Sequence, residues 1–267
     1  MSTRKTIGLA LGSGAYRGFA HIGVIKSLEK HHMPIDFLSG SSIGAWVAAY
    51  YAVFKDISKL EKDLINNQKE NISLLFDFDW TGGLIGGGKF VTYLEKKLQH
   101  YNFTNLKIPL KIVATDLANG QEVILEHGDV AQAVRASTSV PLIFKPLPYK
   151  DKLLVDGGLS NPVPGDVVRN MGADIVIGVN LYNQNDFVAG KITMPNIFAR
   201  STMIAIYNLA QITSKYCDIL IEPDTSRFVK KNTLAKYFTK KVADEMIFIG
   251  EKATDKIIPT LKAKLEL

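Results

Sequence analysis

Cysteine is almost absent from this chain of 267 residues, in which Cys217 is the only one. A single thiol excludes an intramolecular disulfide framework and a cysteine metal cluster, and it suits a reducing compartment. The five histidines form no H-E-x-x-H pair or similar metal-binding spacing. We therefore expect neither a metal site nor another cofactor.

Segments that would target the chain or span a membrane are also lacking. The first residues, MSTRKTIGLALGSG, carry a basic pair but no long apolar stretch, so we do not expect a signal peptide. Residues 37–54 hold no charge, but glycine and serine fill most of positions 39–44, and the apolar run that remains is too short to cross a bilayer. The sequence predicts a cytoplasmic protein that could touch a membrane from its surface.

The length and composition fit a single globular α/β domain over residues 1–267. Hydrophobic residues make up 46% of the chain and charged residues 22%, and no linker or internal repeat divides the sequence. The net charge of +6 would permit attraction to anionic lipid or nucleic acid. The basic residues are spread among acids on expected helix faces, however, and we find no nucleic-acid motif. We expect no nucleic-acid partner.

The chain is organised around residues 36–54. A short apolar strand runs into GSSIG at 40–44, and helix-forming residues follow. This is the G-x-S-x-G motif in a strand–turn–helix setting, which holds the central Ser42 in strained geometry and lifts its side chain clear of the sheet. A Cβ at Gly40 or Gly44 would collide with a neighbouring strand or helix. The free N–H groups at the start of the helix would face an oxyanion formed at Ser42.

A second loop of small residues lies at 12–18, between a strand at 6–11 and a helix that runs to about His31. Such a loop presents backbone N–H groups to an anion. Dinucleotide binding is a poor explanation, because the glycines at 12, 14 and 18 are spaced one residue too far apart and no ribose-binding acid ends the next strand. A Walker A loop is excluded, since no Gly-Lys-Ser/Thr follows.

An acidic residue, Asp156, ends the expected strand in KLLVDGG, directly before two glycines. In an open α/β sheet, functional sites lie at such strand ends. By itself an aspartate at this position more often caps a turn. No histidine follows His127, so the order Ser–acid–His of an α/β-hydrolase triad is not available.

Four blocks in this order resemble the patatin-like phospholipase family, in its bacterial single-domain form. They are SGAYRG at 13–18, GSSIG at 40–44, ASTSVP at 136–141 and the DGG at 156–158. The resemblance covers roughly residues 6–222 and leaves further helices at 233–264. It implies a three-layer α/β/α sandwich with a mostly parallel central sheet, and a Ser-Asp dyad that cleaves acyl esters of lipids.

The same resemblance implies a role for each site residue. Ser42 is the nucleophile and Asp156 the base. Backbone N–H groups of Ser13, Gly14 and Ala15 form the oxyanion hole, although the family more often has glycine at the first and third of these positions. The supporting residues are Arg17, Gly40, Gly44, Gly157 and Gly158. Among them, the arginine helps to hold an anionic head group or the loop.

Two alternatives remain open at this point. The chain could be an interaction protein that retains the hydrolase fold as a regulator or adaptor, although the intact dyad argues against it. The glycine-rich segment 80–88 is either a plain linker or a lip that touches an acyl chain or a membrane through Trp80, Leu84 and Ile85. The expected partners are a lipid or acyl-ester substrate and, transiently, a membrane surface.

Overall fold

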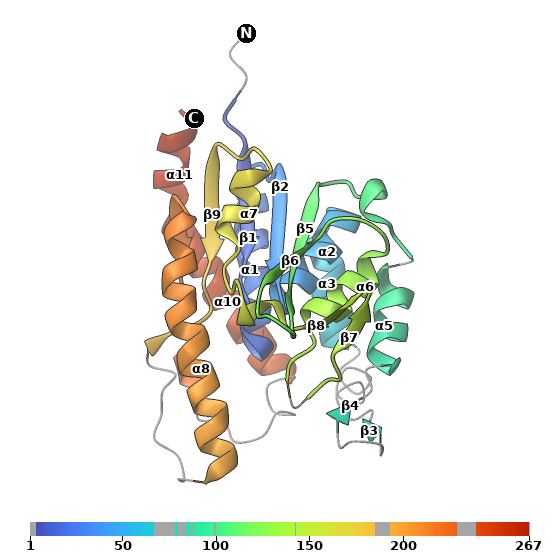
Figure 1. The fold of residues 1–267 in the computed structure, drawn as a ribbon. Coiled ribbons are helices and arrows are strands. Elements are labelled where there is room, and N and C mark those ends of the chain that lie inside the picture. Colours follow the sequence, from blue (N-terminus) through green and yellow to red (C-terminus); the bar gives the residue numbers. More distant parts are fainter. Residues whose placement is uncertain are drawn as a thin grey trace.

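An eight-stranded sheet forms the centre of the molecule (Figure 1). The computed structural model describes residues 4–66, 78–79, 84–85, 88–98, 100–141, 143–184, 193–228 and 239–266. The strands of the sheet are β1 (Ile7–Leu11), β2 (Phe37–Ser41), β5 (Leu110–Asp116), β6 (Glu122–Leu125), β7 (Leu147–Tyr149), β8 (Lys152–Val155), β9 (Ile175–Val179) and β10 (Ile219–Ile221). A separate antiparallel pair consists of β3 (Phe78–Asp79) and β4 (Leu84–Ile85).

Five of the eight strands are parallel, in the order β10-β9-β1-β2-β5. All residues of β1 and β9 are buried, as expected for near-continuous apolar strands covered on both faces. The remaining strands, β6, β7 and β8, pair in antiparallel fashion at the β5 end of the sheet. The prediction of a mostly parallel sheet is confirmed.

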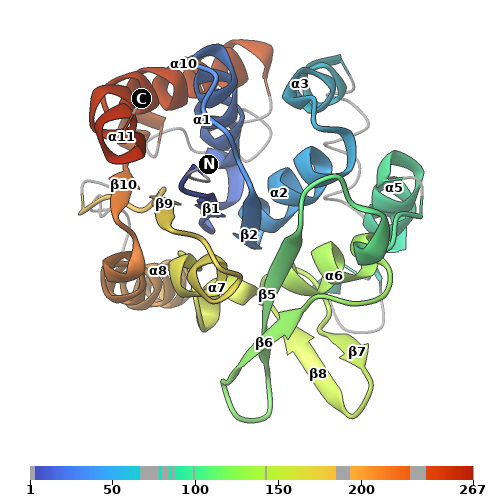
Figure 2. The same ribbon diagram turned by 90° about the horizontal axis from the view of Figure 1, so that it is seen from above.

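Helices cover both faces of this sheet and give the predicted three layers (Figure 2). One face carries α1, α2, α10 and α11, and the other carries α7 and α8. The helices are α1 (Phe19–Lys30), α2 (Ile43–Phe54), α3 (Ile57–Asn66), α5 (Gly88–Leu98), α6 (Val130–Ser137), α7 (Gly165–Asn170), α8 (Met194–Thr213), α10 (Lys240–Asp255) and α11 (Ile258–Leu265). Short 3-10 turns include η1 (Ala15–Gly18), η3 (Gly157–Leu159) and η5 (Ser214–Tyr216).

The C-terminal helices are part of this packing. Helix α10 packs against α1 so closely that their backbones touch, and a glycine on each helix permits this contact. A Cβ at Gly23 would lie 1.9 Å from the carbonyl oxygen of Ile247, and one at Gly250 would lie 2.0 Å from that of Ala20. These helices were expected at 233–264. The structure begins α10 at Lys240, and residues 233–238 lie outside the described part of the chain.

One helix start differs from the sequence expectation. Residues 58–70 have the sequence pattern of a polar-faced helix with Ser58 as its cap. In the structure α3 begins at Ile57, and the Asp56 carboxylate accepts a hydrogen bond of 3.0 Å from the Ser58 N–H. Aspartate is as good a capping residue as serine, and in this helix Asp56, two residues before Ser58, is the cap. The part of the expected helix beyond 66 is not described.

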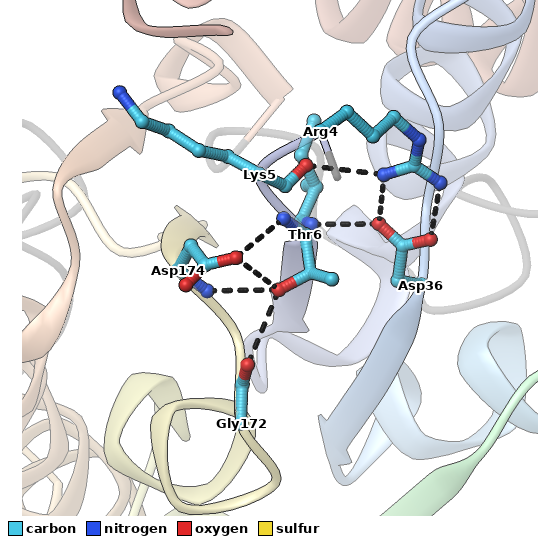
Figure 3. Close-up of polar contacts among 7 residues, drawn as sticks. Arg4, Lys5, Thr6, Asp36, Gly172 and Asp174 are labelled. Atoms are coloured by element: carbon cyan, nitrogen blue, oxygen red, sulfur yellow. Dashed lines mark hydrogen bonds and ion pairs between the residues drawn. The ribbon is translucent and has the colours of Figure 1, made fainter. Parts of the chain in front are cut away.

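Polar contacts join the starts of three parallel strands (Figure 3). Arg4 donates two hydrogen bonds, of 2.6 and 2.7 Å, to Asp36, which also accepts one of 2.8 Å from the Ile7 N–H. Asp174 accepts bonds of 2.7 and 2.8 Å from the N–H and hydroxyl of Thr6. The start of β1 is thereby joined to the starts of β2 and β9, and the opposite ends of these strands are left for the site.

Candidate active site

Strand β5 brings the ends of β2 and β8 together. Strand β2 runs parallel to β5 and its last pair is with Val113, whereas β8 runs antiparallel and its last pair is with Thr115. Because β6 occupies the other edge of β5 at both positions, β2 and β8 meet head to head along one edge. Ser42 directly follows β2 and Asp156 directly follows β8, so both reach the gap between the two strands.

The turn at Ser42 has the strained backbone that the motif predicts. Its φ of 55° and ψ of −124° lie in a region that non-glycine residues rarely occupy. A Cβ at Gly44 would lie 2.0 Å from the Leu11 carbonyl oxygen, and one at Gly40 would lie 2.5 Å from the Cα of Ala45. The steric reason proposed for both glycines is confirmed, and α2 begins directly after the serine.

The two predicted dyad residues are hydrogen-bonded to each other. The Ser42 hydroxyl donates to Asp156 Oδ2 over 2.6 Å, and the Gly158 N–H donates to Oδ1 over 2.8 Å. Burial raises the pKa of Asp156 to about 6, and the bonds from Ser42 and Gly158 limit the rise. The carboxylate is therefore a stronger base than an exposed aspartate and is still largely ionised at pH 7.

The segment 137–139 holds the backbone on both sides of this pair. The Ser42 N–H donates to Ser137 Oγ over 2.8 Å, and the Asp156 N–H donates to the Ser139 carbonyl oxygen over 3.1 Å. The buried Arg135 donates to Ser139 Oγ over 2.6 Å and to the Lys145 carbonyl oxygen over 2.9 Å. The sequence marked this block only by family resemblance. Its structural role is to fix two segments that lie 114 residues apart.

The first loop lies against the same site, but its three expected donors are not equivalent. The Ser13 N–H donates to the Pro162 carbonyl oxygen over 2.8 Å, so it is not free for an oxyanion. The N–H groups of Gly14 and Ala15 have no acceptor in the described part of the chain. The same holds for Ile43, the first residue of α2, which agrees with the free N–H groups expected at the start of this helix. Ala15 has a φ of 52°, where glycine would be unstrained.

The other supporting residues stabilise the loop and the base. Arg17 is buried, with its guanidinium 5.2 Å from the Tyr16 ring centroid and 5.7 Å from that of Tyr182. This placement favours holding the loop over binding a head group. A Cβ at Gly158 would lie 2.6 Å from Ser13 Oγ, and one at Gly157 would lie 2.2 Å from the Val113 carbonyl oxygen. The two glycines therefore allow the segment that follows Asp156 to lie close to strand β5 and to the first loop.

The expectation for Trp80, Leu84 and Ile85 is not tested. Trp80 and the glycines at 82, 83, 86 and 87 lie outside the described residues, and only the backbone of Leu84 and Ile85, as strand β4, is described. Among the helices that the structure describes, none is both long and apolar enough to cross a membrane.

We predict that Ser137→Ala lowers kcat for a water-soluble ester by about tenfold to a hundredfold, because the buried Ser42 N–H loses its acceptor and the turn shifts. KM should change little, since the Ser137 side chain is fully buried and its hydroxyl accepts the bond from the Ser42 N–H. Steady-state kinetics on a short-chain ester measures both constants. A fall in thermal stability with unchanged kcat would contradict a positioning role, and Ser137→Thr, which keeps the oxygen, should restore part of the rate.

Comparisons with known proteins support the family resemblance of the four sequence blocks. The family model described as patatin-like phospholipase matches residues 9–168. Patatin-like phospholipase domain-containing protein 6 of Homo sapiens is 32% identical over 190 residues, which make up 69% of this chain and 14% of that protein. An uncharacterized NTE family protein of Mycobacterium tuberculosis is 32% identical over 200 residues, which make up 74% of this chain and 55% of the relative. The chain thus corresponds to only part of the length of these relatives.

One solved structure supports the fold. VipD from Legionella pneumophila aligns with a TM-score of 0.56 and 15% identity, covering 94% of this chain and 67% of VipD. At this identity the similarity concerns the fold alone. The family match, in contrast, spans more than half of the chain and includes the first loop, the serine turn, the 136–141 segment and Asp156. The chain belongs to the patatin-like phospholipase family.

Proposed function

We propose that the chain is a serine hydrolase of lipid acyl esters, of the phospholipase A or lysophospholipase type, that works with a Ser42–Asp156 dyad. The observation that carries the proposal is the hydrogen bond of 2.6 Å between the hydroxyl on the strained turn and a buried carboxylate. Membership of the patatin-like phospholipase family supports the lipid substrate.

The proposed reaction has two steps. Asp156 accepts the hydroxyl proton while Ser42 Oγ attacks the acyl carbonyl carbon, and the proton then passes to the departing alcohol. In the second step Asp156 accepts a proton from a water molecule whose oxygen attacks the acyl carbonyl carbon. The bond between that carbon and Ser42 Oγ then breaks, the proton returns to Ser42 Oγ, and the carboxylic acid is released. The negative charge on the carbonyl oxygen is stabilised by N–H groups of Gly14, Ala15 and Ile43, together with the N-terminus of α2.

The positions of the histidines support a dyad over a triad. His21 is buried and bonds to the Gly12 carbonyl oxygen through Nε2 over 2.7 Å, and His31 pairs with Asp255 at 3.2 Å. In the part of the chain that the structure describes, Ser42 Oγ has Asp156 as its side-chain partner and no histidine. We expect slower turnover than in a triad enzyme, because a carboxylate is a weaker base than imidazole.

Labelling with a fluorophosphonate, which reacts with activated serines, tests the proposal directly. We expect the purified chain to be labelled and to hydrolyse a short-chain p-nitrophenyl ester, and Ser42→Ala to do neither. A folded protein that is neither labelled nor active would favour the alternative of a regulator or adaptor that retains the hydrolase fold.

We predict that hydrolysis is independent of metal ions. The sequence has neither an acidic Ca²⁺ loop nor a zinc spacing, and the proposed steps use only the dyad and backbone donors. The ester hydrolysis rate of purified protein should stay within about twofold after treatment with EDTA. Loss of activity that Ca²⁺ or Zn²⁺ restores would contradict the prediction.

A further inference from the structure

Helix α8 carries apolar side chains that the fold does not cover. Of its 20 residues only Arg200 is charged. An apolar helix of this kind is usually buried. In α8, however, the only described side chains that are buried are those of Ala210 and Thr213, both close to its C-terminal end. Among the described residues, the first half of the helix therefore contains no buried side chain.

This first half projects past the sheet at the end where Ser42 lies. Helix α8 connects the C-terminal end of β9 to the start of the parallel strand β10, so it runs against the strand direction and begins at the site end. Twenty helical residues span about 30 Å and a five-residue strand about 17 Å. Figure 1 shows the N-terminal end of α8 extending beyond the strands.

The projecting end presents one apolar face. Met194, Ile197 and Phe198 are spaced so that they share a side of the helix, and they are 79%, 45% and 55% exposed. We call these three residues the α8 tip. Side chains of this size are seldom left exposed together without a partner.

We propose that the α8 tip docks on an anionic lipid surface and so brings the Ser42 site to its substrate. The inference rests on the proposed function. Three features favour a lipid over a protein partner. The tip lies at the same end of the molecule as the dyad, α8 contains no acidic residue, and the chain has a net charge of +6, opposite in sign to anionic lipids.

Vesicle binding by matched variants of the full chain tests the proposal. The tip variant is Met194→Ser with Phe198→Ser. The control is Ile212→Ser with Tyr216→Ser, whose side chains are each 56% exposed but lie at the other end of α8 and just beyond it. Co-sedimentation uses phosphatidylcholine vesicles with and without phosphatidylglycerol. Thermal unfolding checks that both variants are folded.

The expected result is binding of the unaltered chain to the anionic vesicles, reduced at least about tenfold in the tip variant and by less than about twofold in the control. Equal binding by all three proteins would overturn the proposal. So would light scattering that shows a dimer which the tip variant dissociates, because the tip would then bind a second copy.

The proposed function is tested separately by hydrolysis of a water-soluble ester by the unaltered chain. Tip-dependent vesicle binding without any ester hydrolysis would support the docking surface and contradict the hydrolase. Ester hydrolysis without tip-dependent vesicle binding would support the hydrolase and contradict the docking surface.

Discussion

Ser42→Ala is expected to lower ester hydrolysis by at least about a thousandfold while the chain stays folded. The substitution removes one oxygen and its hydrogen bond to Asp156 and leaves the backbone turn in place. Without the hydroxyl no acyl-enzyme can form, and the oxyanion donors alone would give only weak residual catalysis. The rate on a soluble ester and the mass of the acyl-enzyme measure the loss.

Ser41→Ala is a matched control for this substitution. Ser41 is the preceding residue, is fully buried, and its hydroxyl has no hydrogen-bond partner in the described part of the chain. Its removal should leave the rate within about threefold, and stability should not fall, since no bond is lost. Purified Ser42→Ala that keeps more than about a thousandth of the unaltered rate, or equal losses in the two variants, would contradict the assignment of the nucleophile.

Asp156→Asn is expected to lower kcat by orders of magnitude and, unusually for a buried position, to stabilise the protein at neutral pH. An amide cannot take the Ser42 proton, so the rate falls. The amide can still accept the bond from the Gly158 N–H through its oxygen and donate to Ser42 Oγ, so the packing is kept. What is removed is the cost of burying a charge.

The raised pKa of Asp156 determines how the stability difference between Asp156→Asn and the unaltered chain depends on pH. Because the pKa of Asp156 is raised to about 6 in the folded chain, the folded state holds the proton more tightly than the unfolded state does. The contribution of this carboxyl to stability is present below about pH 4 and is lost as the pH rises through 6. At pH 8 the Asn variant should therefore be more stable by about 1–3 kcal/mol, and the difference should vanish near pH 4.

Chemical denaturation at several pH values measures this difference. In the unaltered chain, kcat/KM should rise with pH through about 6, as the carboxylate ionises. Asp116→Asn is expected to change stability in the opposite direction. A hydrogen bond from Lys152 lowers the pKa of Asp116, so this variant should be less stable than the unaltered chain at neutral pH. Asp156→Asn that is active, or less stable than the unaltered chain at every pH, would contradict the assignment.

The sequence predicted those parts of the site that depend on neighbouring residues. The strand–turn–helix around Ser42 was predicted correctly because its two glycines and its apolar flanks stand within a few residues of each other. Local signals of the same kind, an aspartate before a short helix and an Asn-Gly pair between two strands, account for the cap of α6 at Asp129 and the hairpin turn at Gly120. The family resemblance added Asp156, which its local sequence alone would have assigned to a turn.

Long-range contacts could not be predicted in this way. The Ser13 N–H bonds to Pro162, far along the chain, and no local pattern reveals that this donor is already used. The role of Ser137 depends in the same way on a neighbour 95 residues away. The apolar sequence of α8 favours burial, and only its place in the fold shows that its first half projects beyond the sheet.

The head-to-head approach of β2 and β8 along β5 also determines when the site can form during folding. Its two side chains are separated by 114 residues, so their pairing requires closure of a long loop and docking of the β7–β8 hairpin. Chains dominated by such distant contacts fold slowly. We therefore expect the Ser42–Asp156 pair to form late in folding, after most of the secondary structure. A chain in which the β7–β8 hairpin has not docked would be compact but inactive.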